Sequence, residues 1–316
     1  MSAQAEAVPP VDASALVRRV APPTYADESG DAHVFNAVNA LREKLGSGLL
    51  TQNARLDRAA LAHHKYMGNN PFVNMHAETA GKPGFTGADA TSRGHAAGYG
   101  ASYIEEVIYG SDGADRFAGC APSWANSIYH VGLFFSGMRD VGIAALATRS
   151  DPGAARYTVC VVNFSLDASK VEQLPEDGTI RVYPYPDQTR VPTVFYNHTE
   201  EPSPLPEYFE LGPPVTLSFK TKSFLAAGPK PAIVVDHLSI ATANGQPLGA
   251  RILVSPVGGI STRGPALRND EMIAPFTLTI VPIARMKPNT VYTVAFAGIV
   301  NGHARSKTWK FSTGER

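Results

Sequence analysis

The chain has 316 residues, more than one hydrophobic core usually serves, and this length predicts two domains of roughly 150 residues each. With 44% hydrophobic and 18% charged residues, the composition is that of a globular protein and excludes intrinsic disorder. Lys plus Arg and Asp plus Glu each total 28, and no basic stripe with interleaved aromatic residues occurs. We therefore expect no nucleic acid partner. The apolar runs are far shorter than the ~20 residues that cross a bilayer, so we expect no transmembrane segment.

The first residues of the sequence suggest that the protein is exported from the cytosol. Ala3-Gln4-Ala5 has the small-x-small form that remains beside a signal-peptidase cut, although no basic or apolar region precedes it. We expect a secreted or periplasmic protein whose signal peptide has been removed, and an ordinary Ala/Pro tail is the alternative. Residues 1–30 contain two Pro-Pro pairs and are expected to form a flexible arm.

Helical patterns come first along the chain. Apolar residues at helical spacing predict a helix over 34–45, with Gly46 as its stop. Asn53 is a predicted N-cap for a helix that ends near Gly68, and a shorter helix is expected over 88–97. Two near-continuous apolar runs, 141–148 and 157–164, predict strands covered on both faces.

The pattern changes near residue 169. Eight prolines precede that position and 17 follow it, and the second part has period-two runs separated by turn residues. Asn244-Gly245 and Asn301-Gly302 have the composition of type I′ hairpin turns. The predicted strands are 180–183, 193–196, 215–219, 233–240, 251–254, 276–281, 292–297 and 308–312. They indicate a β-sandwich over 179–316, joined by a linker over 169–178 to a first domain over 31–168.

The common catalytic motifs are absent from the sequence. It contains no His-Glu-x-x-His, no Gly-x-Ser-x-Gly elbow and no phosphate-binding Gly-x-x-x-x-Gly-Lys loop. His63 and His64 are adjacent, so on a helix they point about 100° apart and at most one can join a given site. Cys120 and Cys160 do not have the spacing of a zinc ribbon. They form either one bridge or two buried thiols, and export favours the bridge.

Several dispersed motifs remain, in a fixed order. They are Asn39-x-x-Arg42, Asn74-Met75-His76, Tyr103-Ile104-Glu105-Glu106, Trp124-x-x-Ser127-x-x-His130 and Asp140-Val141-Gly142-Ile143-Ala144. In this order, over about 31–165, the chain resembles the bacterial, SCP-like branch of the CAP superfamily of cysteine-rich secretory, antigen 5 and pathogenesis-related 1 proteins. The resemblance implies an α-β-α sandwich, and hence an α+β fold followed by the all-β domain.

The resemblance also implies a cleft formed by His76, Glu105 and His130. Two neutral imidazoles can hold Zn²⁺ and leave positions open, although two protein ligands make a weak site. The sequence departs from the family pattern, because Glu106 replaces the usual asparagine and Ser127 stands where many members have a second glutamate. The acidic set is complete only if Glu78 or Glu106 turns inward.

The second domain resembles bacterial immunoglobulin-like domains, on the segments 282–294 and 307–313. Taken together, the two resemblances imply a secreted protein that binds a small apolar or amphipathic ligand, or a divalent metal, in its cleft. One alternative is an interaction module that binds a cell-envelope component and has a vestigial cleft. The other is a metal-dependent hydrolase in which Glu105 orients water.

Overall fold

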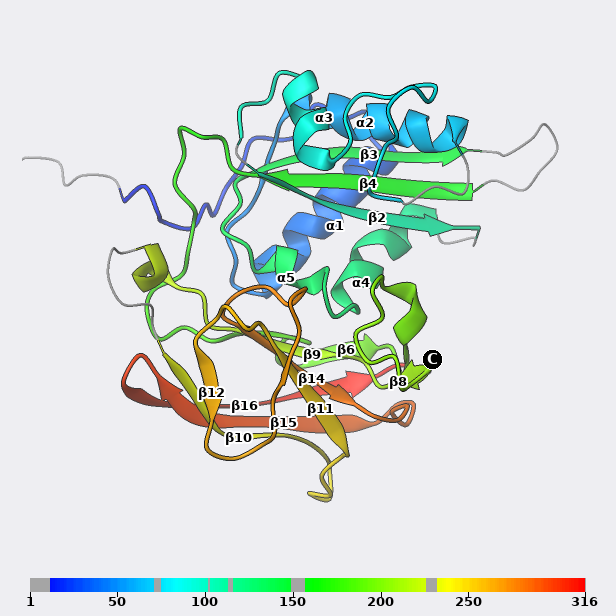
Figure 1. The fold of residues 1–316 in the computed structure, drawn as a ribbon. Coiled ribbons are helices and arrows are strands. Elements are labelled where there is room, and N and C mark those ends of the chain that lie inside the picture. Colours follow the sequence, from blue (N-terminus) through cyan, green and yellow to red (C-terminus); the bar gives the residue numbers. More distant parts are fainter. Residues whose placement is uncertain are drawn as a thin grey trace, which may run out of the picture.

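The computed structural model describes residues 12–70, 75–101, 103–112, 116–148, 157–225 and 232–315. Two domains lie one above the other in Figure 1, the first built from helices around a sheet and the second from strands. Among the described residues, no helix is long and apolar enough to cross a membrane.

A four-stranded sheet of order β1-β3-β4-β2 forms the centre of the first domain. Helices α2 and α3 cover one face of it, and α1, α4 and α5 cover the other, which is the expected α-β-α sandwich (Figure 1). Its strands are β1 (Thr51–Gln52), β2 (Ile104–Ser111), β3 (Asp140–Thr148) and β4 (Tyr157–Ser165). Its helices are α1 (Gly30–Lys44), α2 (Ala54–Asn69), α3 (Ala90–Ala96), η1 (Arg116–Gly119), α4 (Cys120–Ala125) and α5 (Val131–Phe134).

Local sequence signals account for the long helices. The side chain of Asn53 caps α2 by accepting from the backbone N–H of Arg55, as predicted. Helix α2 then packs directly on β3, where a Cβ on Gly142 would lie 2.1 Å from the carbonyl carbon of Leu56. Only glycine therefore permits this close approach between helix and sheet.

A disulfide joins the two cysteines. Cys120 at the start of α4 is bonded to Cys160 in the centre of β4. The bridge closes a loop of 40 residues, for which the chain-entropy model gives about 4 kcal/mol of stabilisation. It fixes α4, and with it the Trp124 to His130 segment, against the sheet.

The second domain is a β-sandwich of two five-stranded sheets, ordered β12-β10-β15-β16-β6 and β13-β11-β14-β9-β5. Its elements are β5 (Arg181–Tyr183), β6 (Gln188–Val191), β7 (Phe195–Tyr196), η2 (Asn197–Thr199), β8 (Glu210–Leu211), β9 (Val215–Ser218), η3 (Lys222–Leu225), β10 (Ile233–Thr242), β11 (Ala250–Val254), β12 (Ile260–Thr262), β13 (Arg268–Asn269), β14 (Thr277–Pro282), β15 (Val291–Val300) and β16 (His303–Thr313). The predicted strands correspond to β5, β7, β9, β10, β11, β14, β15 and β16, and the short strands β6, β8, β12 and β13 were not predicted. Asn301 and Gly302 both have positive φ, as a type I′ turn requires, whereas of Asn244-Gly245 only Gly245 does.

The predicted arm and the predicted linker both lie against the domains. Of the predicted arm, residues 12–29 contact the first domain. The N–H of Val17 donates to the side chain of Gln173, and the Tyr25 hydroxyl donates to Asp57. Leu174, in the predicted linker, is fully buried. The described part of the arm is therefore packed rather than flexible, and the linker is packed as well, because both carry apolar or hydrogen-bonding side chains that contact the domains.

The two domains share a buried core. Ile128 of the first domain packs with a group of buried residues of the second: Phe195, Leu205, Leu211, Leu253, Ile273 and Val281. Arg181 of β5 is almost fully buried, donates to the Ser47 hydroxyl at 2.9 Å and lies 5.5 Å from the centre of the Phe135 ring. The interface thus holds the two domains in one arrangement.

Candidate functional site

Two histidines of the first domain face each other. His76 lies in the loop between α2 and α3, and His130 immediately precedes α5, so the two come from opposite sides of the edge strand β2. Their ring centres are 6.3 Å apart and the ring planes differ by 27°. The side chain of His76 is 48% exposed and that of His130 is 25% exposed, which leaves both accessible to a small ligand.

Glu106 of β2 is the carboxylate that supports His76. Its Oε1 accepts a hydrogen bond from Nδ1 of His76 at 3.2 Å, and Arg93 of α3 donates to both of its oxygens at 2.8 Å. Burial would raise the pKa of Glu106, but the His76 hydrogen bond and the charges of Arg93 and His63 outweigh it and lower the pKa. Glu106 is therefore an anion that fixes the His76 ring through its Nδ1 atom.

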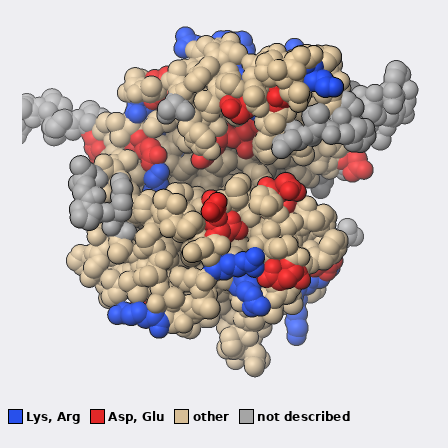
Figure 2. Space-filling view, viewed as in Figure 1, with Lys and Arg blue, Asp and Glu red and all other residues tan. Residues whose placement is uncertain are grey.

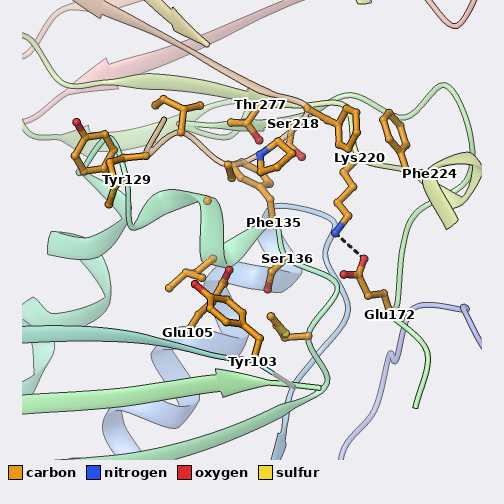
Figure 3. Close-up of a pocket in the computed structure, with 18 of the residues that line it drawn as sticks. Tyr103, Glu105, Tyr129, Phe135, Ser136, Glu172, Ser218, Lys220, Phe224 and Thr277 are labelled. Carbon is orange, nitrogen blue, oxygen red and sulfur yellow. Dashed lines mark ion pairs between the residues drawn. The ribbon is translucent and has the colours of Figure 1, made fainter. Parts of the chain in front are cut away.

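The expected triplet of His76, Glu105 and His130 does not form. Successive residues of a strand point to opposite faces of the sheet, so Glu105 points away from Glu106 and lines a hollow between the two domains (Figure 3). The prediction placed the motif one residue too early along β2. In the structure it is Glu106 that faces His76. Glu106 was one of the two carboxylates, with Glu78, that the sequence analysis considered as turning inward.

A buried cluster lies behind Glu106. His63 of α2 has Glu78 at 2.9 Å from Nδ1 and the Met75 carbonyl at 2.7 Å from Nε2. Each ring nitrogen of His63 therefore faces a buried oxygen that can accept a hydrogen bond. His63 and Arg93 lie against the carboxyl groups of Glu78 and Glu106, and all four side chains are buried. This cluster fixes the position of Glu106.

His130 is held by Ser127 and by a residue of the other domain. The Ser127 hydroxyl donates to the Trp124 carbonyl and accepts from the backbone N–H of His130. Nδ1 of His130 lies 3.3 Å from this Ser127 oxygen and 3.4 Å from Oε1 of Glu200. Ser127 therefore positions the turn that presents His130.

Glu200 was not predicted from the sequence. It follows η2 in the β-sandwich, its side chain is 1% exposed, and its Oε1 accepts from the backbone N–H of Tyr129 at 3.0 Å. Its Oε2 is buried without a hydrogen-bond partner. No motif marks this position, because the contact joins residues 70 apart in different domains. Glu200 therefore brings a second carboxyl group to the cleft, beside the position that Ser127 occupies.

The first motif on α1 supports the same region. Asn39 exchanges two hydrogen bonds with the backbone of Leu50. Arg42 is fully buried and donates to backbone carbonyls at both Leu133 and Ser136, at 3.0 Å each. These contacts satisfy carbonyls at and just beyond the C-terminal end of α5, the helix that begins directly after His130. Asn39 and Arg42 therefore act on the site through the backbone.

The contacts of the two rings define their chemistry. Glu106 is an acceptor beside Nδ1 of His76, and the acceptors beside Nδ1 of His130 are Ser127 and Glu200. Each neutral ring therefore carries its proton on Nδ1 and its lone pair on Nε2. Imidazoles that donate from one nitrogen to a carboxylate are the usual ligands of Zn²⁺.

The two histidines could bind a metal ion while leaving some of its coordination positions open to other ligands. Two imidazole nitrogens would supply two of the four positions that Zn²⁺ takes, and water or a ligand would fill the others. Over the described ranges, no three His, Cys, Asp or Glu side chains converge on one point in the way a closed metal site requires. Glu106 and Glu200 would orient the histidines and would not bind the ion themselves.

Comparison with known proteins identifies the first domain. The family model "CAP: Cysteine-rich secretory protein family" matches residues 35–164. An extracellular protein containing a SCP domain from Bacillus anthracis str. Ames is 19% identical, with a TM-score of 0.35, over 44% of this chain and 40% of that one. The copper resistance protein PcoC from Escherichia coli is 13% identical, with a TM-score of 0.23, over 44% of this chain and 99% of that one.

Likenesses as distant as these two carry no argument about function. No curated protein matches the chain. The family match, the order of the motifs and the layered fold agree with one another. Residues 35–164 are therefore a CAP domain, a member of the cysteine-rich secretory protein family.

Proposed function

We propose that the CAP domain of this chain is a binding domain that holds a divalent cation, with Zn²⁺ as the best match, between His76 and His130. The observation that carries the proposal is that each ring has a carboxylate beside its Nδ1: Glu106 for His76 and Glu200 for His130. This arrangement fixes the tautomer that a metal needs and makes Nε2 a stronger donor. A small ligand would complete the coordination.

We place this activity outside the cytosol. The Cys120–Cys160 disulfide supports this, because such bonds persist in oxidising compartments and are rare in the cytosol.

The proposal is tested by calorimetric titration of the apoprotein with Zn²⁺ near neutral pH. We expect one site per chain that is lost in the His76→Ala/His130→Ala variant. The matched control is His33→Ala, since His33 is half exposed on α1 and its polar contacts in the described part of the chain are with Ser29 and Glu28, away from the cleft. The proposal fails if the double variant binds Zn²⁺ as tightly as the wild type, or if neither binds.

A further inference from the structure

A second concave site lies between the two domains, away from the histidines. It is a hollow of about 660 Å³, within the size range of small-molecule pockets. Its wall from the CAP domain includes Phe135 and Met138, and its wall from the β-sandwich includes Met272, Pro275 and Phe276. The hollow exists only because the two domains pack together, as Figure 3 shows.

The walls are largely apolar and in part open to solvent. Met272 is 50% exposed, and Tyr103 at the opposite rim is 58% exposed. Apolar side chains that remain this accessible in a concave site favour an apolar ligand, because binding removes their surface from water.

The charges in the hollow are mainly negative. Among its described lining residues, Glu105, Glu172 and Glu271 are acidic and Lys220 is the one cation. Lys220 is already paired with Glu172 at 2.6 Å, as the dashed line in Figure 3 marks. On the face seen in Figure 2, acidic side chains gather along the seam between the domains. The site is therefore electrostatically complementary to a cation.

Glu105 is the group that a cation would meet. Its side chain points into the hollow (Figure 3), and the described residues give it neither a hydrogen-bond donor nor an ion-pair partner. Burial raises the pKa of Glu105 to about 7; the charge of Lys220 opposes this rise and that of Glu172 adds to it. A largely buried carboxyl without a protein partner is costly when ionised, and a bound cation would relieve that cost.

We propose that this interdomain hollow binds a cationic amphiphile, with the amine hydrogen-bonded to Glu105 and the apolar body against Phe135, Met138, Met272 and Phe276. Because the hollow includes neither His76 nor His130, its ligand is independent of the metal. The β-sandwich thus serves as one wall of a binding site in addition to contributing Glu200 to the cleft.

The test uses the full chain and three probes of equal length below their micellar concentrations: dodecylamine, dodecanol and dodecanoate. At pH 8 we expect dodecylamine to bind at least tenfold more tightly than the other two. Glu105→Gln should remove this preference, and Glu207→Gln, a matched change at an exposed acid outside the hollow, should retain it. For the wild type alone, dodecylamine affinity should fall as the pH is lowered through 7.

Two results would overturn the proposal. One is equal binding of the three probes by the wild type, which would leave a charge-insensitive apolar surface. The other is an unchanged preference for dodecylamine in Glu105→Gln. Should that variant not fold, Met272→Lys changes an exposed wall residue and adds a cation, and it must weaken dodecylamine binding if the site is correct. Zn²⁺ binding is measured on the same samples, so that a failure of the amphiphile site can be told apart from a failure of the metal site.

Discussion

Oε1 of Glu200, in the β-sandwich, lies 3.4 Å from Nδ1 of His130, in the CAP domain. This contact makes the cleft a product of both domains. It supplies a second carboxylate at a cleft whose own helix offers Ser127 in place of an acid. It also places a buried carboxyl group of one domain beside a histidine of the other, so the geometry of the site depends on how the domains pack together.

Glu200→Gln removes that charge at nearly constant volume. We expect Zn²⁺ affinity to fall about 10-fold to 100-fold, the usual cost of losing a carboxylate that orients a metal-binding histidine. Calorimetric titration measures the change, and Glu201→Gln, at the exposed neighbouring position, is the matched control. Equal losses in the two variants, or none in either, would show that Glu200 does not orient His130.

Arg93→Met tests the buried ionic cluster. Removing the guanidinium leaves Glu106 buried with less compensation, so we expect the free energy of unfolding to fall by about 3 to 5 kcal/mol. Urea denaturation measures it, and Arg93→Met/Glu106→Gln should recover part of the loss because both members of the pair are then neutral. Additive losses in the double variant would mean that the pair does not act as a unit.

Glu105 makes stability depend on pH in a defined direction. Its pKa is about 7 when folded, raised by burial, and about 4.3 in an unfolded chain. The unfolded state therefore releases this proton first, and the free energy of unfolding decreases as the pH rises from about 4.5 to above 7, by up to about 3 kcal/mol. Glu105→Gln should remove this component. Urea denaturation across that range, with wild type and variant compared, gives the difference, and parallel curves would refute the assignment.

Gly142→Ala tests the approach of α2 to the sheet. The added Cβ meets backbone atoms of Leu56 and Asp57 at 2.1 and 2.4 Å, so the helix must shift, and we expect several kcal/mol of destabilisation. Gly68→Ala is the matched control, since nothing lies within 4 Å of its Cβ and helix propensity predicts a gain of up to about 1 kcal/mol. Thermal unfolding separates the two. A mild effect at Gly142 would mean that α2 moves easily, and with it His63.

Local signals in the sequence account for much of the fold. Caps and apolar spacing place α1 and α2 to within a few residues, because Asn53 and Gly46 act on their own turns. It is harder to predict which of Glu105 and Glu106 faces His76, since an error of one residue along a strand exchanges the two faces of the sheet. Glu200 cannot be found locally, because its contact with His130 exists only once two separate cores have packed together.

The most direct test of the two-histidine site is the X-ray absorption spectrum of the Zn²⁺-loaded protein. The account predicts two imidazole ligands per zinc, with oxygen donors in the remaining positions, and one imidazole in either His76→Ala or His130→Ala. A spectrum without imidazole scattering, or one that both substitutions leave unchanged, would contradict it.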